Sequence, residues 1–323
     1  MIKYAVIGAG WRSEFYIRIA LLLPKKFQIS GIYIRNPQKK AEFKEKYNIK
    51  ITDSLDELLK TDFDFIVSCA NKDNICEMIK TLSDKNIPVL SETPVSDKTL
   101  KGKIQVAEQF HLMPRNQAYK KIIESGILGD LTQVRLSCCH DYHAVSLIRF
   151  FLETGFEIPE TETFSLADSV TRYNGRYGLL SSPEIVDSEE KIKIFKFKNK
   201  IAVYDFSYEQ YFSDIRRSRI LIRGTKGEIL NDSCTYLKGN VPFSFEIKRN
   251  SCGQNENLDG HSLMSITAEG KILYDNPFKY ARFSDEEIAV ASALCKMKDF
   301  IDKGIKFYSA EDAAFDAELA LNL

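Results

Sequence analysis

The stretch Lys3-Tyr4-Ala5-Val6-Ile7-Gly8-Ala9-Gly10-Trp11-Arg12-Ser13 decides the fold of this chain. Its first five residues form a short apolar run that predicts a buried strand, and the glycines predict a tight turn. A helical pattern follows as far as Pro24, and a second apolar run covers residues 27–34. This strand, glycine turn, helix and strand form the unit that places a dinucleotide pyrophosphate on a helix N-terminus. Gly8 permits the turn and Gly10 lets a phosphate approach the backbone, whereas an ordinary glycine turn of another α/β fold is the alternative interpretation.

Composition limits the class of protein. The chain has 323 residues, enough for two domains, and 45 Lys plus Arg balance 45 Asp plus Glu. This balance argues against nucleic acid or an anionic membrane as a partner, and no run approaches the roughly 18 apolar residues of a membrane span. The first strand starts at once, which leaves no room for a signal peptide. Seven cysteines, an odd number, are typical of a reducing compartment, so a cytoplasmic location is expected.

Alternating strands and helices continue through the first third of the chain. Strands are predicted at residues 63–68, 87–90 and 104–107, with helices at 37–47, 53–59 and 74–85. Such alternation is typical of a doubly wound parallel sheet, that is, a Rossmann domain over residues 1–117. The connection from Pro94 to Ile104 is so short that its crossover helix has room for a turn or two at most.

The pattern changes in residues 118–323, for which we predict a second domain. Strands joined by turns indicate an open mixed or antiparallel sheet with helices on one face. Lysines at alternate positions, such as Lys191 and Lys193, suggest a solvated face of this sheet. Residues 175–190 are the best candidate for a mobile loop. The expected strands are 131–137, 164–171, 191–198, 201–208, 218–223 and 227–230, with a further pair near 243–248 and 263–274, and the expected helices are 116–125, 285–303 and 310–321.

Five motifs, spread from the first residues to the last, resemble the Gfo/Idh/MocA family (glucose-fructose oxidoreductase, inositol dehydrogenase and rhizopine catabolism). They are Gly8-Ala9-Gly10, Ser91-Glu92-Thr93-Pro94, Ser125-Gly126-Ile127-Leu128-Gly129-Asp130, Gly224-Thr225-Lys226-Gly227-Glu228 and Ser309-Ala310-Glu311-Asp312-Ala313. The resemblance implies an NAD(P)-dependent oxidoreductase that transfers hydride between the cofactor and a sugar- or polyol-like alcohol or carbonyl. It also implies a homodimer or homotetramer formed through the open face of the second sheet.

The chain departs from this family in its expected catalytic groups. Thr93 occupies the place of the lysine in the family's Glu-Lys-Pro motif, and threonine supplies a hydrogen bond but no positive charge. Cys139 stands where the family has an aspartate, four residues before its histidine, which is retained as His143. These losses support an alternative function, a dinucleotide-binding sensor or partner protein with weak or no turnover.

His143 is the first candidate for general acid/base catalysis, because an imidazole with a pKa of about 6.5 exchanges protons at neutral pH. A histidine that only caps the helix is the alternative. His140 is expected to act as second base or hydrogen-bond partner, and Asp141 as helix N-cap or, less favoured, as the group that orients a histidine. A zinc site built on Cys138, Cys139, His140 and His143 is disfavoured, since adjacent cysteines at a strand end should point to opposite faces.

The cofactor site is predicted around the first helix and the strand ends. Ile34 replaces the usual carboxylate at the end of the second strand, and Arg35 beside it suits a 2′-phosphate, so NADP is favoured over NAD. Arg35 stacking on adenine is the alternative interpretation. Substrate contacts are expected from Tyr173, Tyr208 and Tyr211, and His111 is either a further contact or a core histidine. The predicted cofactor-binding residues are Gly8, Ala9, Gly10, Trp11, Arg12, Arg35, Cys69, Ala70, Asn71, Glu92 and Thr93.

Overall fold

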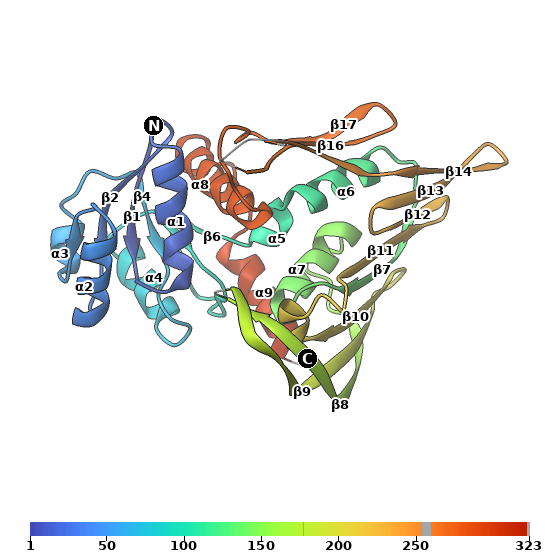
Figure 1. Ribbon diagram of the computed structural model, residues 1–323, viewed down its shortest axis with the longest axis horizontal. Coiled ribbons are helices and arrows are strands. Elements are labelled where there is room, and N and C mark those ends of the chain that lie inside the picture. Colours follow the sequence, from blue (N-terminus) through green and yellow to red (C-terminus); the bar gives the residue numbers. More distant parts are fainter. Residues whose placement is uncertain (177, 254–259, 322–323) are drawn as a thin grey trace. The chain divides into compact units, whose positions relative to one another are not determined.

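A computed structural model describes residues 1–176, 178–253 and 260–321. The chain forms two compact units (Figure 1). The first contains residues 1–114, 251–264 and 276–318, and the second contains residues 115–250, 265–275 and the residues from 319 on. The helix α8 (Asp285–Lys303) and most of α9 (Ala310–Leu321) therefore lie in the first unit. The sequence-based division at residue 117 had placed these helices in the second domain, since a linear pattern does not show that the chain returns.

The first unit is built on a parallel sheet in the order β3-β2-β1-β4-β5-β6. This is the strand order of a Rossmann fold. Successive strands are added on one side of β1 up to β3 and on its other side from β4 on, so the strand order, not the strand direction, reverses between β1 and β4. The predicted fold class is thus confirmed for this unit. The strands are β1 (Ile2–Ile7), β2 (Phe27–Tyr33), β3 (Ile51–Thr52), β4 (Phe65–Ser68), β5 (Val89–Ser91) and β6 (Ile104–Val106).

Helices and strands of this unit share one core. Strands of a sheet covered on both faces read as continuous apolar runs, and every residue of β4 and β5 is buried. One cluster contains Ile75 and Ile79 of α4, together with Tyr308 and Ala313 from the C-terminal segment. In Figure 1, α8 runs beside α1. The helices of this part are α1 (Trp11–Leu22), α2 (Pro37–Lys46), α3 (Leu55–Leu58), α4 (Ile75–Ser83) and α5 (Gln109–Leu112).

The edge strand β6 confirms the strand expected at residues 104–107, although no helix precedes it between residues 92 and 103. Its free edge is covered by the segment before α9. The backbone N–H of Val106 donates to the carbonyl oxygen of Tyr308 at 2.9 Å. The side-chain oxygen of Gln105 accepts from the backbone N–H groups of Phe307, at 2.8 Å, and Tyr308, at 3.1 Å. An exposed edge strand would invite pairing with another chain, and this segment prevents it.

The second unit contains a mixed sheet in the order β14-β13-β12-β11-β7-β10-β9-β8. Only β7 and β10 run parallel; the other neighbours are antiparallel. Helix α7 (Asp141–Leu152) packs against β7, which confirms the predicted open mixed sheet with a helix on one face. The other elements of this unit are α6 (Pro114–Glu124), β7 (Leu131–Ser137), β8 (Glu160–Gly175), β9 (Gly178–Lys196), β10 (Ile201–Ser207), η1 (Tyr208–Phe212), β11 (Arg219–Gly224), β12 (Gly227–Leu230), β13 (Ser233–Lys238), β14 (Val241–Glu246) and β17 (Lys271–Asp275). The strands β15 (Lys248–Cys252) and β16 (Ser262–Ala268) contain residues of both units.

Two expectations about this sheet are wrong. Residues 175–190 are not a loop, because β8 and β9 pair from Glu160 and Lys196 up to Gly175 and Gly178, with residue 177 outside the described part. Residues 178–190 are rich in serine and glutamate and contain Pro183, so their composition favours a loop although they form a strand. The lysine face is not solvated either, since Lys193 is fully buried and its ammonium donates to the carbonyl oxygen of Leu319 at 3.1 Å.

Candidate functional site

The candidate site of the first unit lies where β1 and β4 end. The backbone N–H of Gly8 donates to Tyr33 at 3.0 Å, and that of Cys69 donates to Ile7 at 2.8 Å, so the loops after three strands meet there. Gly8 has a φ of +116°, and a Cβ atom on it would lie 2.5 Å from the carbonyl oxygen of Cys69. Only glycine fits this position. Ligands of open α/β sheets bind in this crevice, at the carboxyl ends of the strands where the order reverses.

Gly10 differs from Gly8 in what surrounds it. It is the N-cap of α1, it is exposed, and a Cβ atom on it would meet nothing within 4 Å. The helix has no side-chain cap, and a helix leaves the N–H groups of its first turn without intrahelical acceptors. Ser13, the small third residue of the turn, is buried and donates to the carbonyl oxygen of Gly10 at 2.6 Å. The open space above Gly10 and the uncapped helix end fit an anionic pyrophosphate.

A buried network of charges lies beside this turn. The Arg12 guanidinium donates from Nε to Glu92 Oε2 at 2.9 Å and from Nη1 to Glu286 Oε1 at 2.6 Å. The hydroxyl of fully buried Tyr16 also donates to Glu92, whose side chain is only 5% exposed. Burial alone would lower the pKa of Arg12, but the two carboxylates raise it above its ordinary value. Burial and the Glu92 carboxylate raise the pKa of Tyr16 well above the usual value.

This network shows what sequence reasoning missed. Arg12 and Glu92 were expected beside the cofactor, and here they form an ion pair with each other. Glu286 is far away in the sequence, so no local pattern could reveal it. Tyr16 gave one signal, because its hydroxyl lies on the buried face of α1, next to the apolar residues Ile17, Ile19 and Ala20. The pair of Glu92 with Arg12 also fixes the chain just before Thr93, which is half-buried and precedes a cis peptide bond to Pro94.

The remaining predicted cofactor residues follow the ends of strands. Ile34 is buried after β2, Arg35 next to it is exposed, and Asn36 caps α2. Ala9 and Ala70 are half-buried, and Asn71 is exposed. Cys69 is half-buried, and desolvation raises the pKa of its thiol well above the usual value. The strand ends thus bring Gly8, Ala9, Gly10, Cys69, Ala70 and Asn71 to one edge of the sheet.

Glu108 is a further buried carboxyl that sequence reasoning did not identify. It is 1% exposed, it caps α5, and it accepts from the backbone N–H of Phe110 at 3.1 Å. Burial raises its pKa to about 7, although His111 and the Phe110 N–H group act in the opposite direction. The ring of His111 packs edge-on against Tyr308 at 5.2 Å between centroids. His111 is therefore part of the packing of this unit.

Glu108→Gln should change how stability depends on pH. In the folded state this carboxyl has a pKa of about 7, whereas in the unfolded chain it loses its proton near the ordinary pKa of 4.5. The contribution of this group to the free energy of unfolding is therefore highest below pH 4.5. It falls by on the order of 3 kcal/mol as the pH rises from 4.5 to 7. In urea unfolding, the free energy of unfolding of the variant relative to wild type should increase by that amount between pH 4.5 and pH 7.5. Glu124→Gln, at an exposed position, is the control, and equal pH profiles of wild type and Glu108→Gln would contradict the expectation.

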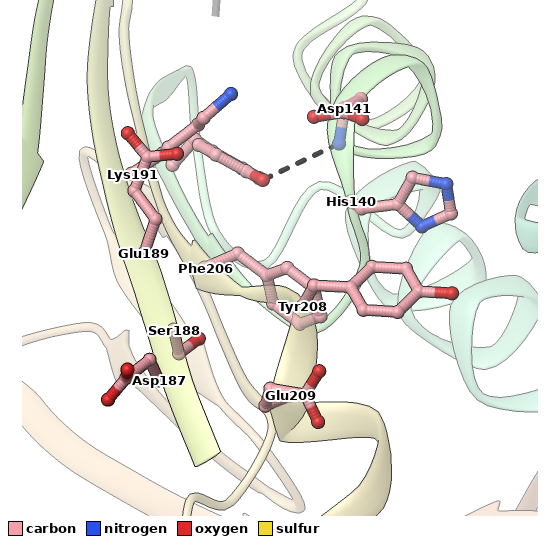
Figure 2. Close-up of a pocket in the computed structure, with 10 residues that line it drawn as sticks. His140, Asp141, Asp187, Ser188, Glu189, Lys191, Phe206, Tyr208 and Glu209 are labelled. Carbon is pink, nitrogen blue, oxygen red and sulfur yellow. Dashed lines mark hydrogen bonds between the residues drawn. The ribbon is translucent and has the colours of Figure 1, made fainter. Parts of the chain in front are cut away.

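A separate candidate site, within the second unit, is a hollow of about 330 Å³. Figure 2 shows Asp187, Glu189 and Lys191 along β9 on one side and Asp141 and His140 at the start of α7 on the other. Lys191 is paired with Phe206 across β9 and β10, so the hollow lies on the same sheet face as buried Lys193. Its size is in the range of small-molecule sites. The lining residues are His140, Asp141, Asp187, Ser188, Glu189, Lys191, Tyr204, Phe206, Tyr208 and Glu209.

The two candidate histidines have different surroundings. His143 is buried, and the Ser146 hydroxyl donates to its carbonyl oxygen at 2.9 Å. His140 is half-buried and lines the hollow, and the two rings lie perpendicular at 5.1 Å between centroids. Asp141 is not the N-cap of α7; His140 takes that position without a side-chain cap bond. Asp141 instead has a φ of +44°, a strained conformation for this residue, and its backbone N–H points to the Tyr204 hydroxyl at 3.5 Å.

In the described residues, the cysteines before His140 are not grouped with the histidines as metal ligands. Their sulfur atoms lie 3.7 Å apart, so the expectation that the two side chains point to opposite faces is wrong. The reason is that β7 ends at Ser137, and the alternation of a strand stops before Cys138 and Cys139. Among residues 1–176, 178–253 and 260–321, no group of three or more His, Cys, Asp and Glu side chains is placed to hold a metal ion.

The three tyrosines expected at the cleft have distinct partners. Tyr208 lines the hollow, and Tyr211 contacts His140 through its hydroxyl. Tyr173 donates to Asp214 at 2.5 Å. Sequence reasoning does not identify the carboxylates of β9, because residues 178–190, which carry them, have the composition of a loop.

In the described part of the chain, no helix has the length and apolarity required to cross a membrane.

Comparison with known proteins agrees with the first unit's architecture. The fold and its glycine turn define a dinucleotide-binding α/β protein, and residues 2–112 match the family described as "Oxidoreductase family, NAD-binding Rossmann fold" (GFO_IDH_MocA). The match agrees with the motifs at residues 8–10 and 91–94, which resemble the Gfo/Idh/MocA family.

The curated relatives match over only part of their length. L-aspartate dehydrogenase of Methanocaldococcus jannaschii is 26% identical over 138 residues, 42% of this chain and 49% of that protein. The L-aspartate dehydrogenase of Methanococcus maripaludis strain C7 is 27% identical over 154 residues, 45% of this chain and 57% of that protein. The aligned part thus spans about half of these relatives.

Solved structures match over nearly the whole chain. An oxidoreductase from Agrobacterium radiobacter, in complex with NAD+, L-tartaric acid and magnesium, has a TM-score of 0.65 at 14% identity and covers 99% of this chain and 94% of its own. Biliverdin reductase from Synechocystis, in complex with biliverdin and NADP+, has a TM-score of 0.62 at 9% identity, with 99% and 96% covered. At such low identity the likeness shows the fold alone, and a fold does not specify a substrate.

Proposed function

We propose that this protein is an NAD(P)-dependent oxidoreductase that transfers hydride between the cofactor and a sugar- or polyol-like alcohol or carbonyl. The turn from Gly8 to Gly10 carries the proposal, because it combines a position open only to glycine with an uncapped helix end at the point where strand order reverses. A bound nicotinamide would supply the hydride chemistry, and the protein would bind, orient and move one proton. The family assignment of residues 2–112 supports this proposal.

Residues of this chain would hold the cofactor in three places. The turn and the first N–H groups of α1 would bind the pyrophosphate. Arg35 would bind a 2′-phosphate, so NADP is favoured over NAD, and the exposure of its side chain supports this role. Cys69, Ala70, Asn71, Glu92 and Thr93 would line the path of the nicotinamide ribose.

Arg35→Ala should lower affinity for NADPH by about 10- to 100-fold, since a charged hydrogen bond contributes about 1.5–3 kcal/mol. Affinity for NADH should change less than about threefold, because that coenzyme has no phosphate at this position. Fluorescence titration of each reduced coenzyme measures both. Lys44→Ala, which removes an exposed cation from α2, is the control. An equal loss for both coenzymes would instead indicate stacking of Arg35 on adenine.

The proton would be exchanged by His143, with His140 as second base or hydrogen-bond partner and Asp141 as a neighbour that shapes the start of the helix. Perpendicular packing of the two rings and the position of His140 at the hollow support this assignment. Thr93 would contribute a hydrogen bond in place of the lysine. His143→Ala should abolish turnover, whereas its coenzyme affinity should stay close to that of wild type.

The lining of the hollow favours a neutral hydroxylated substrate. Four residues with carboxylates, Asp141, Asp187, Glu189 and Glu209, line the hollow together with one lysine, Lys191, and Glu209 is also paired with Arg172 at 3.6 Å. Carboxylates accept hydrogen bonds from hydroxyl groups, and the rings of Phe206 and Tyr208 offer apolar faces to a sugar. A dicarboxylate such as aspartate would be repelled by the same groups, so the substrate named for the relatives suits this hollow poorly. Replacing Glu189 by glutamine would therefore affect neutral polyols and anionic substrates in opposite directions.

Absorbance at the reduced-nicotinamide band decides between enzyme and sensor. Purified protein with NADPH or NADH and a panel of sugars, polyols and aldehydes should show turnover that His143→Ala abolishes. Tight coenzyme binding without turnover on any panel member would favour the sensor. A sensor would also explain the missing lysine.

The open face of the large sheet would form a homodimer or homotetramer. Strand register places exposed Phe164, Ile201, Leu230 and Leu237 on the face opposite to the hollow. Exposed apolar side chains on one face of a sheet are candidates for an association surface. Analytical ultracentrifugation should show dimers or tetramers, and Leu230→Asp should weaken them. A monomeric wild type at micromolar concentration would contradict the assignment.

A further inference from the structure

Tyr211 has an unusual relation to His140. Its hydroxyl oxygen lies 3.0 Å from the backbone nitrogen of His140 and 3.0 Å from Nδ1 of the same residue. A backbone N–H group can only donate, so the phenol oxygen accepts that bond. The hydroxyl hydrogen remains, and Nδ1 is the acceptor within reach. Both contacts are satisfied together when Tyr211 donates to an unprotonated Nδ1.

The protonation state of one imidazole nitrogen is set by the hydrogen bond that the other one makes. We propose that Tyr211 is a positioning residue that holds His140 in the tautomer with its proton on Nε2. His140 then presents a hydrogen-bond donor while it is neutral. This inference rests on the proposed function for its catalytic meaning, since a neutral imidazole N–H polarises a substrate carbonyl or binds a substrate hydroxyl.

The surroundings of Tyr211 keep it suited to this task. Burial raises the pKa of its phenol, with smaller contributions from Cys139, so the hydroxyl keeps the hydrogen that it donates. The ring is fixed by Phe206 at 5.0 Å and Tyr208 at 5.6 Å between centroids. The imidazole of His140 also contacts the rings of Tyr142 and His143. A rigid aromatic cluster therefore holds donor and acceptor in place.

Tyr208 provides a matched control. Its ring also packs edge-on against His140, at 5.9 Å between centroids, but its hydroxyl accepts from Arg176 at 3.2 Å. Tyr208→Phe and Tyr211→Phe each remove one phenol hydroxyl from the same cluster. Only the second removes the partner of Nδ1. Tyr211 is 38% exposed and phenylalanine keeps its ring, so the variant should fold.

Nitrogen-15 NMR of protein labelled in its histidine rings tests the proposal at pH 8. The chain has four histidines, and His140→Gln identifies the signals of His140. Wild type and Tyr208→Phe should show an unprotonated Nδ1 and a protonated Nε2. Tyr211→Phe should shift the tautomer ratio about fivefold toward protonated Nδ1, as loss of one neutral hydrogen bond predicts. A proton on Nδ1 in wild type, or an unchanged ratio in Tyr211→Phe, would overturn the proposal.

The readout needs neither coenzyme nor substrate. A failure of the proposed function, seen as absence of coenzyme uptake, would therefore leave the tautomer result intact. The reverse outcome, coenzyme uptake and turnover with an unchanged tautomer ratio in Tyr211→Phe, would remove only the role of Tyr211. If both hold, Tyr211→Phe should lower kcat several-fold without altering coenzyme affinity, a pattern that a purely structural role would not produce.

Discussion

Gly8→Ala is expected to destabilise the first unit by about 2–5 kcal/mol and to abolish measurable coenzyme binding. The backbone at Gly8 has a φ of +116°, and the added Cβ atom would lie 2.5 Å from the carbonyl oxygen of Cys69. Strain of this kind costs about 1–3 kcal/mol, and overpacking costs a similar amount. The two loops must separate to admit the methyl group, which displaces the turn that would hold the pyrophosphate. Urea unfolding and coenzyme titration measure the two effects.

Gly10→Ala is the matched control, two residues away in the same turn. Its φ of −86° suits alanine, and its Cβ atom would meet nothing within 4 Å. Stability should therefore change by less than about 1 kcal/mol, the scale of a strain-free glycine replacement. The methyl group would occupy space that the phosphate needs, so coenzyme affinity should still fall at least tenfold. Equal stability losses in both variants would contradict the distinction between a packing glycine and a ligand glycine.

Arg12→Met is expected to cost about 3–5 kcal/mol of unfolding free energy and on the order of 10 °C in Tm. The variant fills a similar volume but leaves the Glu92 carboxylate, whose side chain is 5% exposed, without its cation. Glu286 loses its partner as well, although its side chain is 29% exposed and can be hydrated. Removing one member of a buried ion pair is far more costly than replacing both.

A second substitution separates charge from packing. In Arg12→Met/Glu92→Gln the buried amide needs no cation and still accepts from the Tyr16 hydroxyl, so most of the loss should be recovered. Residues in contact give such non-additive energies, whereas independent sites add. Additive losses in the double variant, or a single-variant cost below about 1 kcal/mol, would show that the ion pair contributes little to stability.

Local patterns predicted the first unit well for a physical reason. Strand, glycine turn and helix lie within thirty-five residues, and the conformational demand on Gly8 is encoded by glycine itself. The helices over residues 285–303 and 310–321 were also predicted with their observed bounds, because Ser284 and Ser309 cap them and each buries several apolar residues. Their assignment to a unit was not predictable, since it depends on contacts with β6 and α1 that are distant in sequence.

The candidate site was predicted only in part. Gly8, Gly10 and the histidines are marked by motifs, but the partners of Arg12 and the carboxylates of the hollow come from separate segments. Strands were predicted in part of β8 (164–171) and at the end of β9 (191–198), but residues 178–190 were not predicted as a strand because they are rich in serine and glutamate and contain Pro183. Lys193 was predicted to be solvated, because lysine side chains normally are. Its ammonium instead donates a hydrogen bond to a carbonyl oxygen near the C-terminus.

Titration of the folded protein with NADPH and with NADH, followed by nicotinamide fluorescence, tests the central claim most directly. Saturable uptake of one coenzyme per chain is predicted, tighter for NADPH, and at least tenfold weaker in Gly10→Ala. No uptake of either coenzyme by well-folded wild type, or equal affinity in wild type and Gly10→Ala, would contradict the claim that the turn from Gly8 to Gly10 binds a dinucleotide.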